Sequence, residues 1–397
     1  MNTHGKKIVF VLSRVPYPLE KGDKLRAFHQ LRVLYGHFSI CLIAITDEPI
    51  HPKAEKNLLP YCDEFHVFPI SRASIGFNIF RSLLNGDPLQ VGYFFNKKAC
   101  SEVSEIIDRF DPDVVYGQLL RTAEYLRKIK GPTKVLDYQD TFSKGIERRR
   151  DRSNGPMKWI FSLEYKRLIR YEQAVFTYFD HCTIISEQDR DALPFPEKEK
   201  VSVIPNGVDM DYFAPRQQKP DTDILFAGNM GYPPNVMACQ FLARDVLPIL
   251  NSSMPDIKMT FSGARPTTAV KILADKHVEI TGWVDDMRSS YARTRIFVAP
   301  MMIGTGLQNK LLEAMSMGIP CITTALANNA LGATPNEHIL IAFSPLEFAD
   351  AIKTLLENPQ RAEELGKAGR AFIEDNYGWE AQTKGLVEIL SGDHTSE

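Results

Sequence analysis

Short, continuous apolar runs alternate along the chain with longer stretches in which apolar positions recur with a helical period. In the first half, runs at 7–13, 39–46, 114–118, 133–138 and 181–186 read as strands, and 24–36 reads as a helix. Apolar runs of this kind are typical of parallel strands that helices cover on both faces. The second half shows the same alternation, with apolar runs in "TDILFAG", "IKMTFSG", "HVEITGW", "IFVAPM" and "IPCITT". The pattern predicts two doubly wound α/β units in tandem.

The segment between the two halves, "KVSVIPNGVDMDYFAPRQQKPDTD", is rich in Pro, Asn, Asp and Gly. Such composition forms turns and linkers, so we expect the domain boundary near Asn206, with domains at 1–205 and 206–378. A last amphipathic segment, 378–390, follows the second unit.

Composition places the chain among soluble globular proteins, with 44% hydrophobic and 24% charged residues. A formal net charge of -2 gives no global field that would attract nucleic acid. The six cysteines are scattered without a C-x-x-C pair, which predicts reduced thiols in a cytosolic protein, with no disulfide framework or zinc site. The first apolar run suits a buried strand and is too short for a signal peptide or a membrane span.

The usual phosphate-binding motifs are absent from the sequence. No G-x-x-x-x-G-K-[ST] occurs and no G-x-G-x-x-G follows a strand, which disfavours P-loop enzymes and nicotinamide dehydrogenases. D-x-D occurs at 111–113, 209–211 and 221–223, each time in turn-like sequence. We interpret all three as turns rather than metal sites.

The segment "GTGLQNKLLEAM" follows a predicted strand that ends at Pro300, at the edge where open α/β sheets bind ligands. Gly304 and Gly306 allow a ligand to approach the backbone, and a helix beginning near Leu307 offers free N–H groups to an anion. Lys310 lies in the first turn, where the helix dipole disfavours it, which indicates an anionic partner. Glu313 shares its face about 4.5 Å further along the axis. The alternative is a Lys–Glu pair on a solvated face.

"VSVIPNGVDMDYF" together with "GTGLQNKLLEAMSMGIPCITT" resembles the bacterial family 4 glycosyltransferases of GT-B fold, in the branch of exopolysaccharide-system sugar transferases. The motifs "LFAGNMGYPPN", "FSG", "GWVDDM", "VAPM" and "GIP" extend the resemblance over most of residues 201–380. It implies two Rossmann-like domains facing a central cleft, with 379–397 as a helix returning to the N-terminal domain. It also implies retaining transfer of a sugar from a nucleotide donor, held by the C-terminal domain, to an acceptor hydroxyl at the N-terminal domain.

The resemblance assigns the donor site residue by residue. Glu313 matches the glutamate that holds the donor ribose, and Lys310 would neutralise the diphosphate. Thr305 stands at the position where the family usually has a second glutamate. Backbone N–H groups from Gly304 to Leu307 would then take over part of the donor recognition. Further donor candidates are Asn309 in "NKLLEAM", and Gly228 and Asn229, which lie where relatives often carry Arg and Lys. Arg265 would contact the phosphate or the base. The backbone of Trp283 and Val284 would contact the edge of the base. The ring of Trp283 is expected to pack.

Two segments of the N-terminal half supply candidates for the reaction centre. In the loop "SRVPYPLEKGDKLR", Gly22, Lys24 and Arg26 would contact donor phosphate and acceptor; the alternative is a helix whose first turn happens to be basic. "KVLDYQDTFSKG" ends a strand with Asp137 and Asp140. Either carboxylate could accept the acceptor proton or stabilise positive charge on the sugar ring. We favour Asp140 as the catalytic residue, since Asp137 could be structural and either could simply cap a helix.

The segment 144–170 contains nine basic and three acidic residues with interleaved aromatic residues. It fits contact with an anionic membrane surface or a lipid diphosphate acceptor, and equally an exposed helix pair with salt bridges. We expect a cytoplasmic enzyme and leave open whether this segment contacts the inner face of the membrane. We expect no metal or other cofactor, because the sequence has no carboxylate or histidine cluster and the family manages without one, and no nucleic-acid partner. Two alternatives remain open: a nucleotide-sugar epimerase or hydrolase, and a non-catalytic nucleotide-sugar-binding protein on the same fold.

Overall fold

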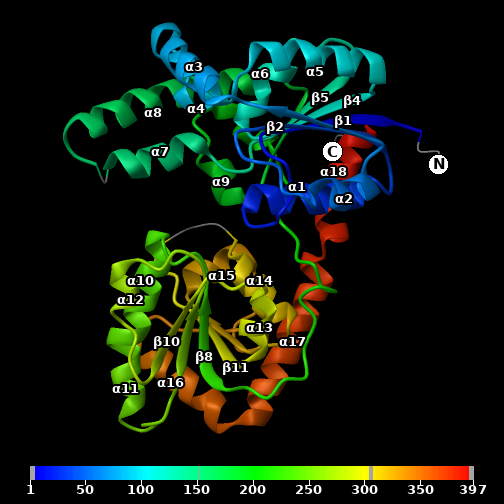
Figure 1. Ribbon diagram of the computed structural model, residues 1–397. Helices are drawn as coiled ribbons and strands as arrows, with labels where there is room; N and C mark the ends of the chain where they lie inside the picture. The colour runs from blue at the N-terminus through cyan, green and yellow to red at the C-terminus, as the bar shows by residue number, and fades with distance from the viewer. Residues whose placement is uncertain (1–4, 152, 304–306, 393–397) are drawn as a thin grey trace. The chain divides into compact units, whose positions relative to one another are not determined.

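The computed structural model describes residues 5–151, 153–303 and 307–392. The chain forms two compact units, one made of 1–205 and 382–397, the other of 206–381. These are called unit 1 and unit 2 below. Figure 1 shows a central sheet in each unit with helices on both of its faces. In the part of the chain that the structure describes, no helix has both the length and the hydropathy needed to cross a membrane.

Unit 1 contains a seven-stranded parallel sheet with the strand order β3-β2-β1-β4-β5-β6-β7. Its strands are β1 (Lys7–Leu12), β2 (Ser39–Thr46), β3 (Glu64–Pro69), β4 (Val114–Gln118), β5 (Thr133–Asp137), β6 (His181–Ile184) and β7 (Ser202–Val203). Its helices include α1 (Gly22–Leu34), α2 (Ala54–Leu58), α3 (Arg72–Asn85), α4 (Leu89–Phe94), α5 (Lys97–Phe110), α6 (Ala123–Leu126), α7 (Phe142–Asp151), α8 (Gly155–Phe176) and α9 (Glu187–Asp191).

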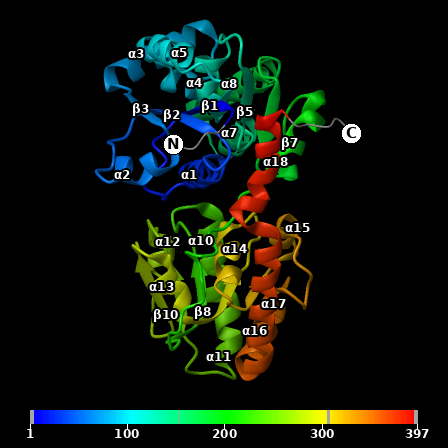
Figure 2. The same ribbon diagram turned by 90° about the vertical axis from the view of Figure 1, so that its right-hand side faces the viewer.

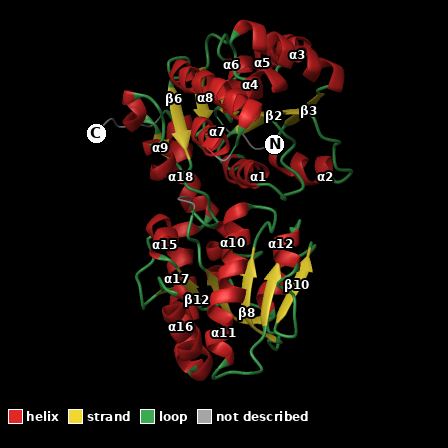
Figure 3. Ribbon diagram, turned by 90° about the vertical axis from the view of Figure 1, so that its left-hand side faces the viewer, coloured by secondary structure: helices red, strands yellow, loops and turns green. Residues whose placement is uncertain are grey.

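Unit 2 contains a six-stranded parallel sheet with the order β10-β9-β8-β11-β12-β13. Figure 3 shows strands of this sheet in yellow, among them β8 and β10. Its strands are β8 (Thr222–Ala227), β9 (Met259–Ser262), β10 (Val278–Gly282), β11 (Thr294–Ala299), β12 (Cys321–Thr323) and β13 (Leu340–Ile341). Its helices include α10 (Pro233–Phe241), α11 (Leu247–Asn251), α12 (Thr268–Lys271), α13 (Met287–Ala292), α14 (Asn309–Ser316), α15 (Ala325–Leu331), α16 (Pro345–Glu357) and α17 (Pro359–Tyr377). The prediction of two doubly wound units is confirmed.

Burial on both faces explains why the strands are continuous apolar runs. On β1, Val9 and Val11 belong to one core cluster of unit 1, and Ile8, Phe10 and Leu12 to the cluster on the opposite face. A strand buried on both faces gains from apolar residues at every position, since successive side chains point to opposite sides.

The last helix, α18 (Trp379–Ser391), begins in unit 2 and continues into unit 1. In unit 1 its apolar residues Leu386, Ile389 and Leu390 belong to the core cluster that also contains residues of β1 and β4. Figure 2 shows α18 in red. This burial explains the amphipathic pattern of the segment.

Candidate functional site

The loops at the carboxyl ends of β8, β9 and β10 are tied together by backbone hydrogen bonds. Gly228 N donates to Ser262 O at 2.9 Å, Met230 N to Ala264 O at 2.8 Å, and Gly263 N to Gly282 O at 3.0 Å. Gly228 and Gly263 have φ values of +152° and +145°, and a Cβ on Gly263 would lie 1.7 Å from Gly228 O. Only glycine fits this close approach. The hydrogen-bonded loops therefore form one fixed surface at the carboxyl edge of the unit 2 sheet.

Lys310, in the first turn of α14, points back over this edge. Its Nζ donates to Asn235 Oδ1 at 2.6 Å, lies 4.7 Å from the centre of the Phe226 ring and would be 3.2 Å from a Cβ at Gly228. No carboxylate of the described residues forms an ion pair with it. Burial lowers the pKa of Lys310 to about 8. The amine is therefore a half-buried cation with an amide partner and no ion pair among the described residues.

Glu313 lies one turn further along α14. Its Oε2 accepts a hydrogen bond of 2.7 Å from the hydroxyl of Tyr291, a buried residue of α13. The Tyr291 ring is fixed between Phe213 and Phe297, with ring centroids 6.2 and 5.6 Å away. Burial raises the pKa of Glu313 to about 7, against the opposing effects of the Tyr291 hydrogen bond and the charge of Lys310.

Lys310 and Glu313 thus have separate partners and do not form the solvated ion pair that was the alternative interpretation. Both side chains are half-buried in unit 2, and the second Glu313 oxygen has no protein partner within the described ranges. The first N–H groups of α14 have no side-chain cap. A cation, a helix start without a side-chain cap and a carboxylate oxygen without a partner among the described residues therefore occur together at the carboxyl edge of this sheet, a combination suited to a nucleoside diphosphate.

The other donor candidates are distributed around the same edge. Gly304, Thr305 and Gly306 lie outside the described residues, and Leu307 and Asn309 are half-buried at the start of α14. Asn229 organises its own loop, since its Oδ1 accepts from Gly231 N at 3.0 Å and its O accepts from Asn235 Nδ2 at 2.9 Å.

Arg265 is exposed and makes no ion pair in the part of the chain that the structure describes. The prediction that the Trp283 ring packs is wrong, because the residue is 64% exposed. Its Nε1 donates to Asp285 Oδ1 at 2.8 Å, while Val284 beside it is half-buried. The ring is therefore free to contact a ligand.

Asp137 and Arg26 form a fully buried ion pair in unit 1. Arg26 Nε donates to Asp137 Oδ2 at 2.7 Å, both side chains are 0% exposed, and the Tyr116 hydroxyl donates to the same oxygen at 3.1 Å. The interpretation of Arg26 as a phosphate ligand and of Asp137 as a catalytic residue is therefore wrong. Each neutralises the other in the core, where neither can reach a substrate.

Lys24 is likewise not available to a phosphate. The residue is 5% exposed, and its Nζ lies 3.0 Å from Glu20 and 3.1 Å from Glu48. Two carboxylates already neutralise this amine, which corrects the prediction that it binds phosphate. Gly22 is exposed and begins α1.

Asp140 remains a candidate for the reaction centre. It follows β5, is exposed, and its backbone N donates to Tyr138 O at 2.8 Å. Surrounding protein removes part of its hydration, which with the charge of Asp189 raises the pKa of Asp140 to about 7, although Arg121 opposes the shift. A carboxylate with this pKa can accept a proton near neutrality.

Arg121, after β4, was not singled out from the sequence. Its guanidinium lies 4.6 Å from the Phe94 ring centre and 5.4 Å from that of Phe142. Its Nε and Nη1 are buried and have no hydrogen-bond acceptor among the described residues. Burial and the charge of Arg14 lower its pKa. Nothing in "QLLRTAEYL" marks this arginine, because only the fold places it near Asp140.

Asn235 and Tyr291 were also missed. Asn235 lies at the end of the segment "GNMGYPPN", and its amide gains a role only because the fold places it 2.6 Å from Lys310 Nζ. Tyr291 has no motif of its own and acts through a hydrogen bond to a residue 22 positions away.

The basic segment 144–170 forms α7 and most of α8. Lys144 and Arg150 form ion pairs with Glu147, and Arg167 donates to the backbone of Ser82, Leu83 and Asp87. Trp159 is 69% exposed. The segment therefore combines internal ion pairs with an exposed aromatic side chain.

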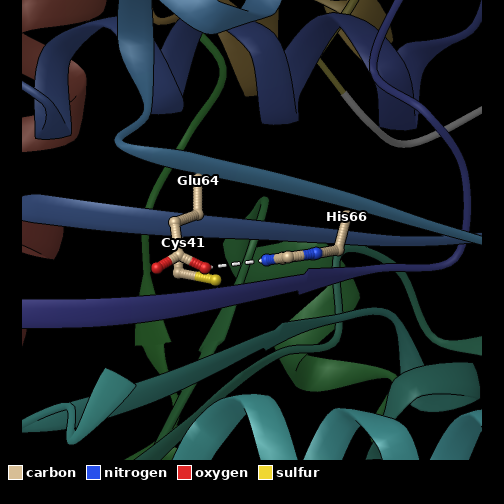
Figure 4. A group of neighbouring side chains, drawn as sticks. All are labelled: Cys41, Glu64 and His66. Atoms are coloured by element: carbon tan, nitrogen blue, oxygen red, sulfur yellow. Dashed lines mark hydrogen bonds and ion pairs between the residues drawn. The ribbon is translucent and has the colours of Figure 1, made fainter. Parts of the chain in front are cut away.

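Figure 4 shows Cys41, Glu64 and His66, whose ligand atoms lie within 4.8 Å of one another. His66 Nε2 lies 2.8 Å from Glu64 Oε2, and Arg109 also pairs with Glu64. Burial raises the pKa of the Cys41 thiol to about 12. A protonated thiol and a carboxylate already paired with a guanidinium favour an ion-pair network over a cation site.

The D-x-D carboxylates also have structural surroundings. The prediction that all three are turns is wrong for 221–223, because Asp223 belongs to β8. Asp221 pairs with Arg293 at 2.8 Å and Asp223 with Arg295 at 3.1 Å.

Residues 221–358 match the family described as "Glycosyl transferases group 1". An uncharacterized 44.6 kDa protein in the cps region of Klebsiella pneumoniae is 24% identical over 396 residues, covering 94% of this chain and 96% of that protein. The GDP-mannose-dependent monoacylated alpha-(1-6)-phosphatidylinositol monomannoside mannosyltransferase of Corynebacterium glutamicum is 25% identical over 251 residues, covering 57% of this chain and 64% of that protein.

The fold of the whole chain is also found among solved structures. HepE of Anabaena, in complex with UDP and glucose, superposes with a TM-score of 0.66 at 14% identity, covering 97% of this chain and 99% of that one. Such a likeness shows the fold alone, whereas the family match rests on sequence. Residues 221–358 are therefore similar in sequence to the group 1 glycosyltransferases, and the chain has the GT-B fold that its motifs predicted.

Proposed function

We propose that the protein transfers a sugar from a nucleoside-diphosphate sugar to an acceptor hydroxyl, with retention of the anomeric configuration, in the synthesis of a polysaccharide or glycolipid. The observation that carries the proposal is the arrangement on α14, where Lys310 and Glu313 face the carboxyl edge of the unit 2 sheet with distinct partners. Among the proteins it resembles, one depends on GDP-mannose and another binds UDP.

In this proposal the diphosphate lies at the uncapped start of α14, where N–H groups and the Lys310 ammonium compensate its charge. Glu313 accepts hydrogen bonds from the ribose hydroxyls through the oxygen that Tyr291 leaves open. The exposed Trp283 ring and the backbone of Val284 contact the base, and Arg265 approaches the phosphates.

The acceptor is held by unit 1. Asp140 takes the proton of the attacking hydroxyl or stabilises positive charge on the sugar ring. Arg121 provides a second charge at this sheet edge, since its buried Nε and Nη1 have no acceptor among the described residues. Catalysis proceeds without a metal ion, because the helix start and Lys310 provide the positive charge that the leaving diphosphate needs.

A thermal-shift screen of UDP, GDP, ADP and their sugars tests the donor site. We expect one base to raise the melting temperature, Lys310→Ala to weaken that rise, and Lys353→Ala on α16 to leave it unchanged as an exposed-lysine control. Failure of every nucleotide to bind would refute the donor assignment.

Product analysis with the donor so identified then separates the three functions. Anomeric retention in a product formed only with acceptor supports the transferase. Free or rearranged sugar formed without acceptor would indicate the hydrolase or epimerase. If Glu313→Ala abolishes donor binding but no acceptor is turned over by the unchanged protein, the result would indicate the binding protein.

A further inference from the structure

The helix α3 exposes an apolar stripe. Its buried residues are polar, Asn78 and Ser82, whereas Phe77, Phe80 and Leu84 are 67%, 60% and 71% exposed. Positions 77, 80 and 84 follow the helical period and therefore form one outward stripe. A surface helix normally buries such a stripe, so its exposure indicates a partner that covers it.

Packing inside unit 1 explains why the inner face is polar. A Cβ at Gly92 of α4 would lie 1.8 Å from Ser82 Oγ, so the two helices approach closely through small groups. Asn78 donates to the backbone oxygen of Phe95, and Arg167 of α8 donates to Ser82 O at 3.2 Å and Leu83 O at 3.0 Å. The orientation of α3 is thus fixed by specific contacts, and its apolar stripe faces outward.

The helix α8, attached to α3 through Arg167, adds an aromatic residue and positive charge. Trp159 is 69% exposed, and the exposed Lys166 and Arg170 lie seven and eleven residues further on, close to the same face of an ideal helix. Neither of these cations forms an ion pair among the residues that the structure describes. The sequence of α3 contains no acidic residue, and Arg81 lies against the Phe95 ring.

We propose that the outward faces of α3 and α8, called the α3–α8 surface, dock this protein on an anionic phospholipid bilayer. Phe77, Phe80, Leu84 and Trp159 enter the interfacial region, and Lys166 and Arg170 contact lipid phosphates. Exposed apolar and aromatic side chains, together with cations that form no ion pair among the described residues, have the chemistry of an interfacial membrane helix, whereas a protein partner would need acidic groups of its own to match this charge. The inference goes beyond sugar transfer and assigns a membrane role to α3.

Co-sedimentation of the full chain with vesicles, without any donor or acceptor, tests this surface independently of the proposed function. We expect binding to vesicles that contain phosphatidylglycerol and little binding to pure phosphatidylcholine. The triple variant Phe77→Ser, Phe80→Ser, Leu84→Ser should lower the bound fraction about tenfold. The pair Lys166→Gln, Arg170→Gln should do so by a similar factor and reduce the salt dependence of binding.

A matched control is Phe343→Ser with Leu346→Ser, which removes two exposed apolar side chains from unit 2. This variant should bind vesicles like the unchanged protein. The proposal is overturned if the triple variant binds normally while its melting curve is unchanged, or if binding ignores anionic lipid. It is also overturned if light scattering shows a dimer that the triple variant dissociates, because a second copy would then cover the stripe.

Discussion

The pH dependence of donor binding follows from the two groups on α14. Ribose binding needs an ionised Glu313, whose pKa is about 7, and diphosphate binding needs a protonated Lys310, whose pKa is about 8. Affinity should therefore be highest between these two values and fall on both sides. The pH profile of binding then has an acid limb and an alkaline limb. Because the two groups interact, the apparent pKa of each limb belongs to the pair rather than to either residue alone.

The magnitude follows from the fraction in the binding-competent form. One pH unit below the pKa of Glu313, about a tenth of the carboxyl is ionised, so the dissociation constant should rise about tenfold, or about 1.4 kcal/mol. Glu313→Gln removes a charged acceptor, which should weaken binding by about 1.5–3 kcal/mol near pH 7.5. The variant should also lose the acid limb and keep the alkaline one.

Isothermal titration calorimetry with the intact nucleotide sugar is the appropriate assay, because a free nucleoside diphosphate has a terminal phosphate that titrates near pH 6. Glu357→Gln, which alters an exposed carboxylate on α16, serves as the control and should retain the full profile. A Glu313→Gln protein with unchanged affinity and an unchanged acid limb would refute the assignment of Glu313 to the ribose.

Three other substitutions and one chelation experiment test the remaining assignments. Tyr291→Phe should move the acid limb of donor binding to higher pH, because the hydroxyl stabilises the ionised Glu313; an unmoved limb in calorimetry would contradict this. Asp137→Ala should cost about 3–5 kcal/mol of unfolding free energy in denaturant titrations, because Arg26 stays buried without its carboxylate. Asp140→Asn should instead leave the melting temperature nearly unchanged and lower turnover about 100-fold or more, and full activity would exclude it from the reaction. Treatment with EDTA should leave turnover unchanged, and a loss that Mg²⁺ or Mn²⁺ restores would show a metal requirement.

Much of the fold was predictable because parallel strands buried on both faces leave a local signal. The residues of β1 from Ile8 to Leu12 are at most 1% exposed, and the same run stands out in the sequence as uninterrupted apolar positions. The side-by-side placement of Lys310 and Glu313 was also predictable, since both lie within one helix whose period fixes their relation.

Which charged residues remain available to a ligand was decided only by tertiary structure. Arg26 and Asp137 are 111 positions apart, and only the packing of α1 against β5 brings them together. Lys24 is not available to a ligand because it pairs with Glu48, whereas two buried nitrogens of Arg121 have no acceptor in the part of the chain that the structure describes. The sequence around these charged residues does not show which of them is neutralised by a partner and which is not.

The outward orientation of the apolar stripe of α3 has the same origin. Its sequence, "RASIGFNIFRSLLN", contains apolar residues on more than one face, and the local pattern does not say which face turns inward. The close approach of Gly92 and the Arg167 contacts select the polar face for burial. Sequence determined the elements and the spacing within each helix, because these depend on neighbouring residues. Pairing of charges and orientation of faces depend on contacts between distant segments, which exist only once the chain has folded.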